Sequence, residues 1–380
     1  MKFSCEKALI QSAISLTSRT VAVKSSIPAL EGLLVEARED HIRITGYDLK
    51  TGIRTVFPAD IRETGSLVLS ARLFGEIIRR MPDDVVTIST DGFTVNLKCN
   101  RSEFNIQGID ASEYPDLPTV DYMNSFQMDQ SALRDMIERT SFAISQSDAR
   151  PIHTGALFDV EEVEQGFYKL SMVAVDGYRL AMRRENISEV SGAKACQFVV
   201  PGAALREVQR IAAGEDLPIQ VIQGERHVMF KTGDVTLVTR RLEGEFLDYR
   251  KAIPTNSSIL VNADTKQLID CIERCSLIIS EQQKSPLRCT FEDGVLKCKT
   301  STALGTAYDE CVVDGNGNGL EIGFNNKYML DALKAAPTPA VKLSLNTAVS
   351  PCIITRAEGT EAPEDAFTYM VLPVRLKAGM

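Results

Sequence analysis

The chain of 380 residues lacks several features that mark common classes of protein. No run of eighteen apolar residues occurs, which argues against a membrane-spanning helix. The first residues, Met1 to Glu6, place an acid where a signal peptide needs an apolar segment, so we expect a cytoplasmic protein with no membrane partner. Only three histidines are present, and none is spaced from a cysteine as zinc ligands require.

The nine cysteines form neither a disulfide framework nor a redox motif. Their number is odd and no CxxC occurs, so we expect reduced, mostly buried thiols. The sequence also has no GxSxG, no P-loop, no HExxH and no paired Cys and His motif. The adjacent carboxylates Asp83 and Asp84 have the polar surroundings of a solvated turn. We therefore predict no catalytic residue, no metal ligand and no cofactor.

A basic surplus is absent as well, because the formal net charge is −9 at pH 7. Taken alone, this argues against nucleic-acid binding, which usually needs a positive surface. The net charge is an average, however, and a basic inner face can coexist with an acidic outer face. The positions of the cations must therefore decide.

The sequence does contain an internal repeat, which organises the whole chain. Apolar residues recur at positions i, i+3 and i+4, one face of a helix, in three segments. These segments are Ile10, Ala13 and Ile14; Leu133, Met136 and Ile137; and Leu268, Cys271 and Ile272. A strand-like run precedes each segment, so each repeat is predicted to begin with a strand and a helix.

A second pattern also returns three times, as a β-like run, a helix, a chain breaker and another strand. The β-like runs begin at Leu67, Phe198 and Leu320, and the helices extend through Met81, Ala213 and Ala336. Two helices and several antiparallel strands per repeat indicate an α+β layer domain. We expect three such domains at residues 1–124, 125–253 and 254–380. The glycine-rich run at 315–319 lacks the GxGxxG spacing and is expected to form a flexible turn.

The second helix of each repeat carries several cations. They are Arg72, Arg79 and Arg80; Arg206 and Arg210; and Lys327 and Lys334. One interpretation is a solvated helix face with ion pairs inside each helix. The other is that the helices face one channel and direct cations at phosphates, which positions a duplex without reading its sequence.

Six short segments carry a family resemblance. They are TGYDL at 45–49, SEYPDLP at 112–118, VAVDGYRLA at 173–181, DYR at 248–250, EIGFN at 321–325 and YMVLPVRL at 369–376. Through them the chain resembles the bacterial β sliding clamps, the processivity subunits of DNA polymerase III. The resemblance extends from Met1 to Leu376, and the tail at 377–380 continues beyond it.

The resemblance implies three clamp domains, each with two helices backed by antiparallel sheets, and a head-to-tail homodimer that closes a six-domain ring. Such a ring has no catalysis of its own, encircles double-stranded DNA of any sequence and tethers the replicative polymerase. Other expected partners are the clamp loader, further polymerases and repair factors, bound through short peptides. Two competing hypotheses are a repeat-built adaptor that does not encircle DNA and a hydrolase with an unrecognised site.

The resemblance also assigns residues by motif. The partner-peptide pocket comprises Val175, Gly177, Tyr178, Arg179, Leu180, Leu247, Lys251, Ala252, Met370, Leu372, Pro373, Val374 and Arg375. Arg179 and Arg375 have a second interpretation as structural ion-pair partners. His153, Leu247 and Lys251 depart from the residues that are frequent at these positions in the family.

The remaining assignments concern DNA and the subunit contact. The DNA-binding residues are Lys24, Arg72, Arg79 and Ser147, to which the helix pattern adds Arg206 and Arg210. The dimer contact comprises Phe104 and Ile106 on one side and Ile278 and Ile279 on the other. Alternating apolar residues on an edge strand suit pairing between sheets of two subunits.

Overall fold

The computed structural model describes residues 1–192, 195–214, 217–280, 285–360 and 366–376, so the tail at 377–380 lies outside the described residues. The chain forms two compact units, which are described separately. The N-terminal unit comprises Met1–Arg134, Ser188–Lys194 and Ala203–Arg241, and the C-terminal unit comprises Asp135–Ile187, Ala195–Gly202 and Leu242–Met380. Helix α3 (Gln130–Thr140), strand β13 (Arg179–Ser191) and helix α4 (Gly202–Ile211) contribute residues to both units.

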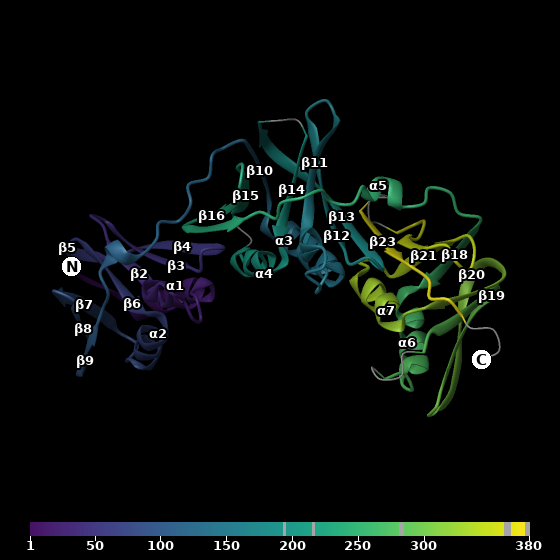
Figure 1. The fold of residues 1–380 in the computed structure, drawn as a ribbon, viewed down its shortest axis with the longest axis horizontal. Helices are drawn as coiled ribbons and strands as arrows, with labels where there is room; N and C mark the ends of the chain where they lie inside the picture. Colours follow the sequence, from purple (N-terminus) through teal and green to yellow (C-terminus); the bar gives the residue numbers. More distant parts are fainter. Residues whose placement is uncertain (193–194, 215–216, 281–284, 361–365, 377–380) are drawn as a thin grey trace. The chain divides into compact units, whose positions relative to one another are not determined.

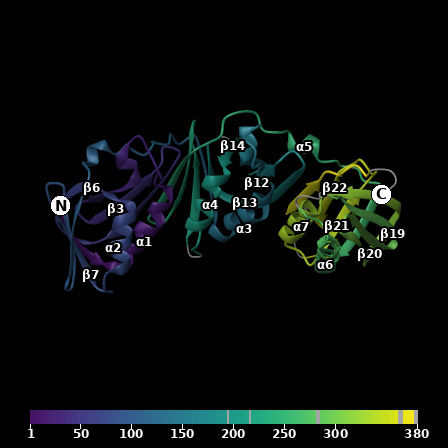
Figure 2. The same cartoon turned by 60° about the horizontal axis from the view of Figure 1, so that its bottom comes forward.

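Two antiparallel sheets and a pair of helices pack together at the start of the N-terminal unit (Figures 1 and 2). The first sheet has the order β5 (Asp60–Glu63), β1 (Lys2–Glu6), β7 (Val85–Asp91), β8 (Thr94–Cys99) and β9 (Ser102–Gln107). The second contains, in order, β6 (Gly65–Ser70), β2 (Gly32–Ala37), β3 (His41–Tyr47), β4 (Thr51–Pro58) and β17 (Val235–Arg240). Helices α1 (Lys7–Thr17) and α2 (Ala71–Arg80) lie side by side.

Apolar residues from both sheets and both helices form one core in this part of the unit. Phe3, Ile10, Phe74 and Ile88 are fully buried within it. The alternation of apolar and polar residues in the strands, and the i, i+3, i+4 spacing in α1, thus bury one face of each element. Helix α2 begins after Ser70, whose hydroxyl accepts a hydrogen bond from the Leu73 amide.

The rest of the N-terminal unit extends the second sheet. Strand β10 (Asn124–Asp129) pairs with β15 (Pro218–Gln223), β15 pairs with β16 (His227–Thr232), and β16 pairs with β17. Strand β17 pairs in turn with β4, which places Thr239 opposite Thr51. Their hydroxyl oxygens are 3.0 Å apart and buried.

The C-terminal unit contains a long series of paired strands. In order of pairing they are β14 (Cys196–Pro201), β11 (Gly155–Glu164), β12 (Phe167–Val175), β13, β23 (Phe367–Val371), β22 (Cys352–Arg356), β21 (Ala340–Leu345) and β18 (Ile259–Asp264). Strand β19 (Leu287–Thr302) pairs along its length with β20 (Gly305–Phe324).

Three further helices belong to this unit. They are α5 (Tyr249–Ala252), α6 (Thr265–Ser276) and α7 (Asn326–Ala335), of which α6 and α7 lie side by side (Figure 1). Single 3-10 turns occur in both units at η1 (Ser18–Thr20), η2 (Pro28–Glu31), η3 (Ala111–Glu113), η4 (Ser141–Ala143) and η5 (Pro151–Thr154).

The structure confirms the α+β class and the six helices that the repeat predicted, namely α1 to α4, α6 and α7. The flexible turn expected at residues 315–319 is wrong, because this run lies inside β20. The glycines are needed there for close packing. A Cβ at Gly317 would lie 2.1 Å from the Cβ of Phe291, and one at Gly315 would lie 2.4 Å from the Leu260 carbonyl oxygen.

All nine cysteines are free thiols, and eight of them are buried. The exception is Cys196, which is partly exposed. Among the helices of the described residues, none is long and apolar enough to cross a membrane.

Candidate functional site

The start of β13 and the end of β23 bring most of the predicted pocket residues together. Leu180 lies opposite Met370, Arg179 lies opposite Val371, and the Leu372 amide donates a 2.9 Å hydrogen bond to the Tyr178 carbonyl. Val175, Leu180 and Met370 are buried in one apolar cluster, against which Leu372, Phe246 and Ile253 pack. Residues from three distant parts of the chain thus meet in the C-terminal unit.

Several residues that adjoin this cluster in the chain are apolar and accessible. Tyr178, Leu247 and Val374 expose 62%, 41% and 38% of their surface. Leu372 and Pro373, which directly precede Val374, are partly buried. These five residues, with the floor formed by Val175, Leu180 and Met370, are called the junction patch below. An accessible surface of this composition suits a short peptide with an apolar anchor.

The turn before β13 is fixed by its own side chains. The Asp176 carboxylate accepts hydrogen bonds from the amides of Tyr178 at 2.9 Å and Arg179 at 3.1 Å. Gly177 has a φ of +91°, a conformation that glycine adopts at little cost. The turn therefore presents Tyr178 outward and directs Arg179 inward.

Arg179 is buried and fully engaged in structural contacts. Its guanidinium donates to Asp176 at 2.8 Å, to Asp331 of α7 at 2.6 Å and to the Phe142 carbonyl at 2.6 Å. It also lies 4.4 Å above the ring of Tyr328. The interpretation of Arg179 as an ion-pair partner thus describes its contacts in this structure, whereas Arg375 is exposed.

Tyr328 is a residue of this site that the sequence did not reveal. Its ring stacks on that of Tyr178, with centroids 6.1 Å apart and an angle of 26° between the planes. Tyr328 and Val374 also line an open depression with Ile279 and Pro286. No sequence signal indicates this, because Tyr178 and Tyr328 belong to different repeats and meet only through folding.

Two further predicted pocket residues, Lys251 and Ala252, lie on α5, which follows strand β17 in the chain. Lys251 is largely exposed and pairs with Asp248 at 2.7 Å, which raises the pKa of the lysine. Ala252 is partly buried. His153 is buried edge-on against Phe246, with ring centroids 5.5 Å apart. Burial, aided by the charge of Arg150, lowers the pKa of His153, so its ring is neutral at pH 7 and behaves as an apolar wall.

The cations predicted to contact DNA differ in their surroundings. Arg72 and Arg79 are exposed on α2, and Lys24 is exposed in the loop after α1. Among the described residues no carboxylate pairs with these three, so their charges are available to an anion. Arg206 is exposed on α4, whereas Arg210 pairs with Glu207 one turn earlier in the same helix. Ser147 is exposed in a loop of the C-terminal unit, where its amide bonds to Ser145.

Of the other cations named by the helix pattern, one has a partner among the described residues. Lys334 of α7 pairs with Glu273 of α6 at 2.6 Å. Arg80 and Lys327 are both exposed. The interpretation as ion pairs inside each helix therefore describes Arg210, whereas Lys334 pairs between two helices. Among the described residues, cations without a carboxylate partner characterise α2.

The predicted dimer residues lie at two edges. Phe104 is 40% exposed on β9, the edge strand of its sheet, whereas Ile106 is buried in the core of the N-terminal unit. Ile278 and Ile279 are partly buried just after α6. Their neighbour Leu277, which the motif did not single out, exposes 83% of its surface.

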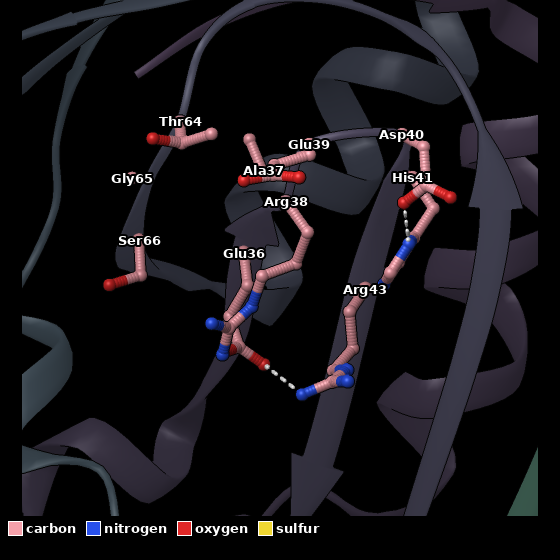
Figure 3. A pocket seen from close by; sticks show the side chains of 10 residues that line it. All are labelled: Glu36, Ala37, Arg38, Glu39, Asp40, His41, Arg43, Thr64, Gly65 and Ser66. Carbon is pink, nitrogen blue, oxygen red and sulfur yellow. Dashed lines mark hydrogen bonds and ion pairs between the residues drawn. The ribbon is translucent and has the colours of Figure 1, made fainter.

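The N-terminal unit also has an open, charged depression of about 680 Å³ between the ends of β2, β3 and β6 (Figure 3). Glu36 forms ion pairs with Arg38 and with Arg43, the latter at 3.6 Å, and the Asp40 carboxylate contacts the His41 ring at 2.6 Å. Most of the charged side chains of this depression are thus paired with one another. The described residues contain no group of three or more His, Cys, Asp or Glu that could hold a metal.

Comparison with known proteins decides the family. Family models for the N-terminal, central and C-terminal domains of the DNA polymerase III beta subunit match residues 1–118, 127–248 and 250–375. The beta sliding clamp of Staphylococcus aureus is 31% identical over 388 residues, with 99% of each chain covered. The chain belongs to the family of bacterial β sliding clamps.

Solved structures of other clamps agree with this assignment. The DNA polymerase sliding clamp of Bacillus subtilis is 28% identical with a TM-score of 0.92, and it covers 99% of this chain and 100% of its own. A putative DNA polymerase III beta subunit from Eubacterium rectale is 29% identical with a TM-score of 0.91 and the same coverage. This clamp thus has the three domains that the repeat predicted.

Family membership also establishes the general function. The chain is a DNA clamp for polymerase processivity, and its partners are DNA and DNA polymerase. The prediction of a DNA clamp is therefore confirmed.

Proposed function

We propose that this clamp closes a head-to-tail homodimeric ring around duplex DNA in the cytoplasm and has no catalytic activity of its own. We further propose domain boundaries at residues 124/125 and 253/254. The proposal rests on one observation above all. The same kind of strand pairing between two repeats, here called a junction, occurs at two places in the chain, and the two strand edges that could form a third such pairing are left unpaired.

The two internal junctions share their geometry. In the N-terminal unit β4 pairs with β17, and in the C-terminal unit β13 pairs with β23. The preceding turns match, because Asp48 accepts hydrogen bonds from the amides of Lys50 and Thr51 just as Asp176 does from the two residues that follow Gly177. Each junction therefore joins a strand that follows such a turn to the last strand of another repeat.

One strand of each kind remains without a partner on one edge. Among the described strands, β9 pairs only with β8, and residues 305–312 of β20 pair only with β19. By the repeat, β9 is equivalent to β17 and β23, and the first part of β20 is equivalent to β4 and β13. Two copies of the chain can satisfy both edges by pairing β9 of one with β20 of the other, and this closes a ring.

The repeat also predicts the register of that contact. Isolated bridges place Ile109, Leu242 and Val374 at equivalent positions. The residues three positions earlier are Ile106, Thr239 and Val371, of which the last two face Thr51 and Arg179. Thr51 is the third residue after the turn residue Asp48, and Arg179 is the third residue after the equivalent Asp176.

In the third repeat Thr302 takes the place of the aspartate, because its hydroxyl accepts a hydrogen bond from the Leu304 amide at 3.1 Å. The third residue after it is Gly305. Ile106 should therefore face Gly305, and the exposed Phe104 should face Ala307, across the subunit contact. Ile278 and Ile279, which follow α6, add apolar surface to the same proposed contact.

The contact with DNA is proposed to be electrostatic. The free cations of α2, Arg72 and Arg79, with Lys24, are available to phosphates, and Arg206, Arg210 and Ser147 extend this set. Phosphate contacts hold a duplex without reading its sequence, and few of them keep the clamp free to slide. Topological closure of the ring, rather than tight binding, is what retains it.

The junction patch is the proposed site for partner proteins. Its exposed apolar residues and buried floor suit short peptides from the replicative polymerase, the clamp loader, other polymerases and repair factors. The full pocket comprises the junction patch with Gly177, Arg179, Lys251, Ala252 and Arg375.

A loading experiment tests the ring. The protein and a clamp loader are incubated with nicked circular DNA, and the complex is isolated by gel filtration before and after linearisation of the DNA. A ring stays on the circle and is lost from linear DNA. Equal retention on both forms would instead support an adaptor that binds DNA without encircling it.

A further inference from the structure

The segment that carries Leu247 and Lys251 needs external support. Helix α5 has a single turn, and the side chain of its N-cap residue, Asp248, makes no capping hydrogen bond. A helix of this length is not stable by itself. Its position beside the apolar cluster must therefore come from contacts with the neighbouring sheet.

A buried carboxylate on β11 supplies those contacts. The Tyr249 hydroxyl donates a 2.8 Å hydrogen bond to Asp159, and both residues are buried. The Arg250 guanidinium pairs with the same carboxylate at 2.8 Å and with Glu161 at 2.7 Å. Arg250 also lies 4.9 Å from the centre of the Tyr249 ring. Two consecutive residues of α5 are thus held by one strand.

The chemistry of this contact makes it rigid. A buried carboxylate is costly unless it is paired and hydrogen-bonded, and Asp159 has both kinds of partner. Burial, with the hydrogen bond to Asp159 as a second cause, raises the pKa of Tyr249 to about 12. The hydroxyl therefore remains a donor throughout the neutral range.

The contact of Tyr249 and Arg250 with Asp159, here called the anchor, is directly connected to the junction patch. The Tyr249 ring belongs to the same apolar cluster as Val175, Leu180 and Met370. Leu247 precedes it by two residues and Lys251 follows it by two. We infer that Asp159, Tyr249 and Arg250 are positioning residues, which hold residues 247–252 as a preformed wall for partner peptides without contacting the peptide themselves. This inference rests on the proposed role of the junction patch.

The test removes the hydroxyl and keeps the ring. Tyr249→Phe is compared with Tyr114→Phe, which deletes another buried tyrosine hydroxyl, bonded to the Thr45 carbonyl in the N-terminal unit. Calorimetry with a polymerase-derived peptide should show binding weakened at least about 10-fold by Tyr249→Phe, as expected for loss of a hydrogen bond to a charged group. Tyr114→Phe should bind like the wild type.

A second readout separates positioning from a general loss of stability. The amides of Ala252 and Ile253 bond to the carbonyls of Asp248 and Tyr249, so their hydrogen exchange reports on α5. Exchange at these two amides should accelerate in Tyr249→Phe and not in Tyr114→Phe. Asp159→Asn keeps an oxygen for the Tyr249 hydroxyl and should bind the peptide more tightly than Asp159→Ala.

The outcomes distinguish the anchor from the patch. The anchor is refuted if Tyr249→Phe binds within twofold of the wild type while Leu247→Asp abolishes binding, or if Tyr114→Phe weakens binding equally. If Leu247→Asp binds like the wild type, the peptide site lies elsewhere and the proposed role of the junction patch fails first.

Discussion

At the scale of single residues, the junction patch separates side chains that can meet a partner from those that build the site. Leu180 and Met370 are buried, so they form a floor. Tyr178, Leu247 and Val374 are accessible, so under the proposed role of the patch their replacement should change partner affinity and leave the fold intact. Arg179 belongs to the residues that build the site, because its guanidinium bridges β13 to α7 and to η4.

Replacement of Leu247 by aspartate tests the accessible surface. The charge lies where an apolar anchor is expected to dock, so peptide binding should fall at least ~10-fold, about 1.4 kcal/mol. Leu260→Asp is the matched control, because Leu260 is a 53% exposed leucine on β18 of the same unit. Calorimetry should find that the control binds normally and that both variants remain dimers. Equal loss in both variants would contradict the assignment.

The pKa of His153 gives a pH dependence with a defined sign. Burial lowers this pKa below the unfolded value of 6.5, so the neutral ring is favoured in the folded state. The resulting stability is fully present above pH 6.5 and is lost as the pH falls from 6.5 through the lowered folded value. In His153→Phe the decline of the thermal midpoint between pH 7 and 5 should be smaller than in the wild type.

His227 must be controlled in the same experiment. Its pKa is also lowered, by burial first and by the nearby Arg240 and Arg226 next. The variant His227→Phe should therefore flatten part of the same decline, and the double variant should flatten more than either single one. A decline that is unchanged in His153→Phe would show that this ring is not protected from protonation.

At the scale of elements, the register inferred for the subunit contact can be checked by cross-linking. Directly opposed residues in antiparallel strands lie about 4.5–5.5 Å apart between Cα atoms, within the range that a disulfide spans. The double variant Phe104→Cys and Ala307→Cys should form a covalent dimer on mild oxidation, seen by non-reducing electrophoresis. The native cysteines interfere little, because eight are buried.

The matched control moves one cysteine along the strand. Val312→Cys, combined with Phe104→Cys, places a thiol five residues from the inferred partner at a site that is 76% exposed. It should cross-link much more slowly. Efficient cross-linking in the control and none in the first pair would require another register.

The sequence predicts the helices of this fold well, because their apolar spacing records which face is buried. The spacing in Ile10, Ala13 and Ile14 matches a face that α1 indeed buries. The pattern failed at Gly315 and Gly317, since glycine marks both turns and close strand crossings, and only the packing against Phe291 and β18 shows which one applies.

The candidate site was only partly predictable for a related reason. Local motifs named Tyr178 and Leu372, and folding brings them together. Tyr328 and Asp159 act through contacts with residues distant in the chain, so no local pattern points to them. Strand register and side-chain pairing across repeats are properties of the fold, and a single sequence does not record them.

At the scale of the whole molecule, the net charge of −9 and the proposed contact with DNA are compatible because only a few cations need to reach phosphates. Arg72 and Arg79 are exposed on α2, whereas Lys7, the first residue of α1 in the same repeat, is buried and pairs with Asp83 at 2.7 Å. A negative average discourages tight adhesion to DNA, and weak contact is what a sliding ring requires.

Removal of the free cations of α2 tests this balance. In the double variant Arg72→Ala and Arg79→Ala, the slope of log affinity against log salt concentration should fall in magnitude by up to about 1.8, since each phosphate contact contributes about 0.9. The loss should be equal for duplexes of different sequence, because phosphates carry no sequence information. Fluorescence anisotropy with duplex DNA measures both quantities. Arg62→Ala is the control, an exposed arginine on β5 that pairs with Asp60 at 3.8 Å.

The same variants should separate contact from closure in the loading experiment. If closure retains the clamp, the double variant loads less efficiently but, once loaded, persists on nicked circular DNA and leaves linearised DNA as the wild type does. The Phe104→Asp variant should behave in the opposite way, since a charge at the proposed subunit contact weakens the ring while the cations of α2 remain. Its complexes should leave circular DNA rapidly even at low salt. Rapid loss of the Arg72 and Arg79 double variant from circles, with normal persistence of Phe104→Asp, would mean that ion pairs rather than ring closure hold this clamp on DNA.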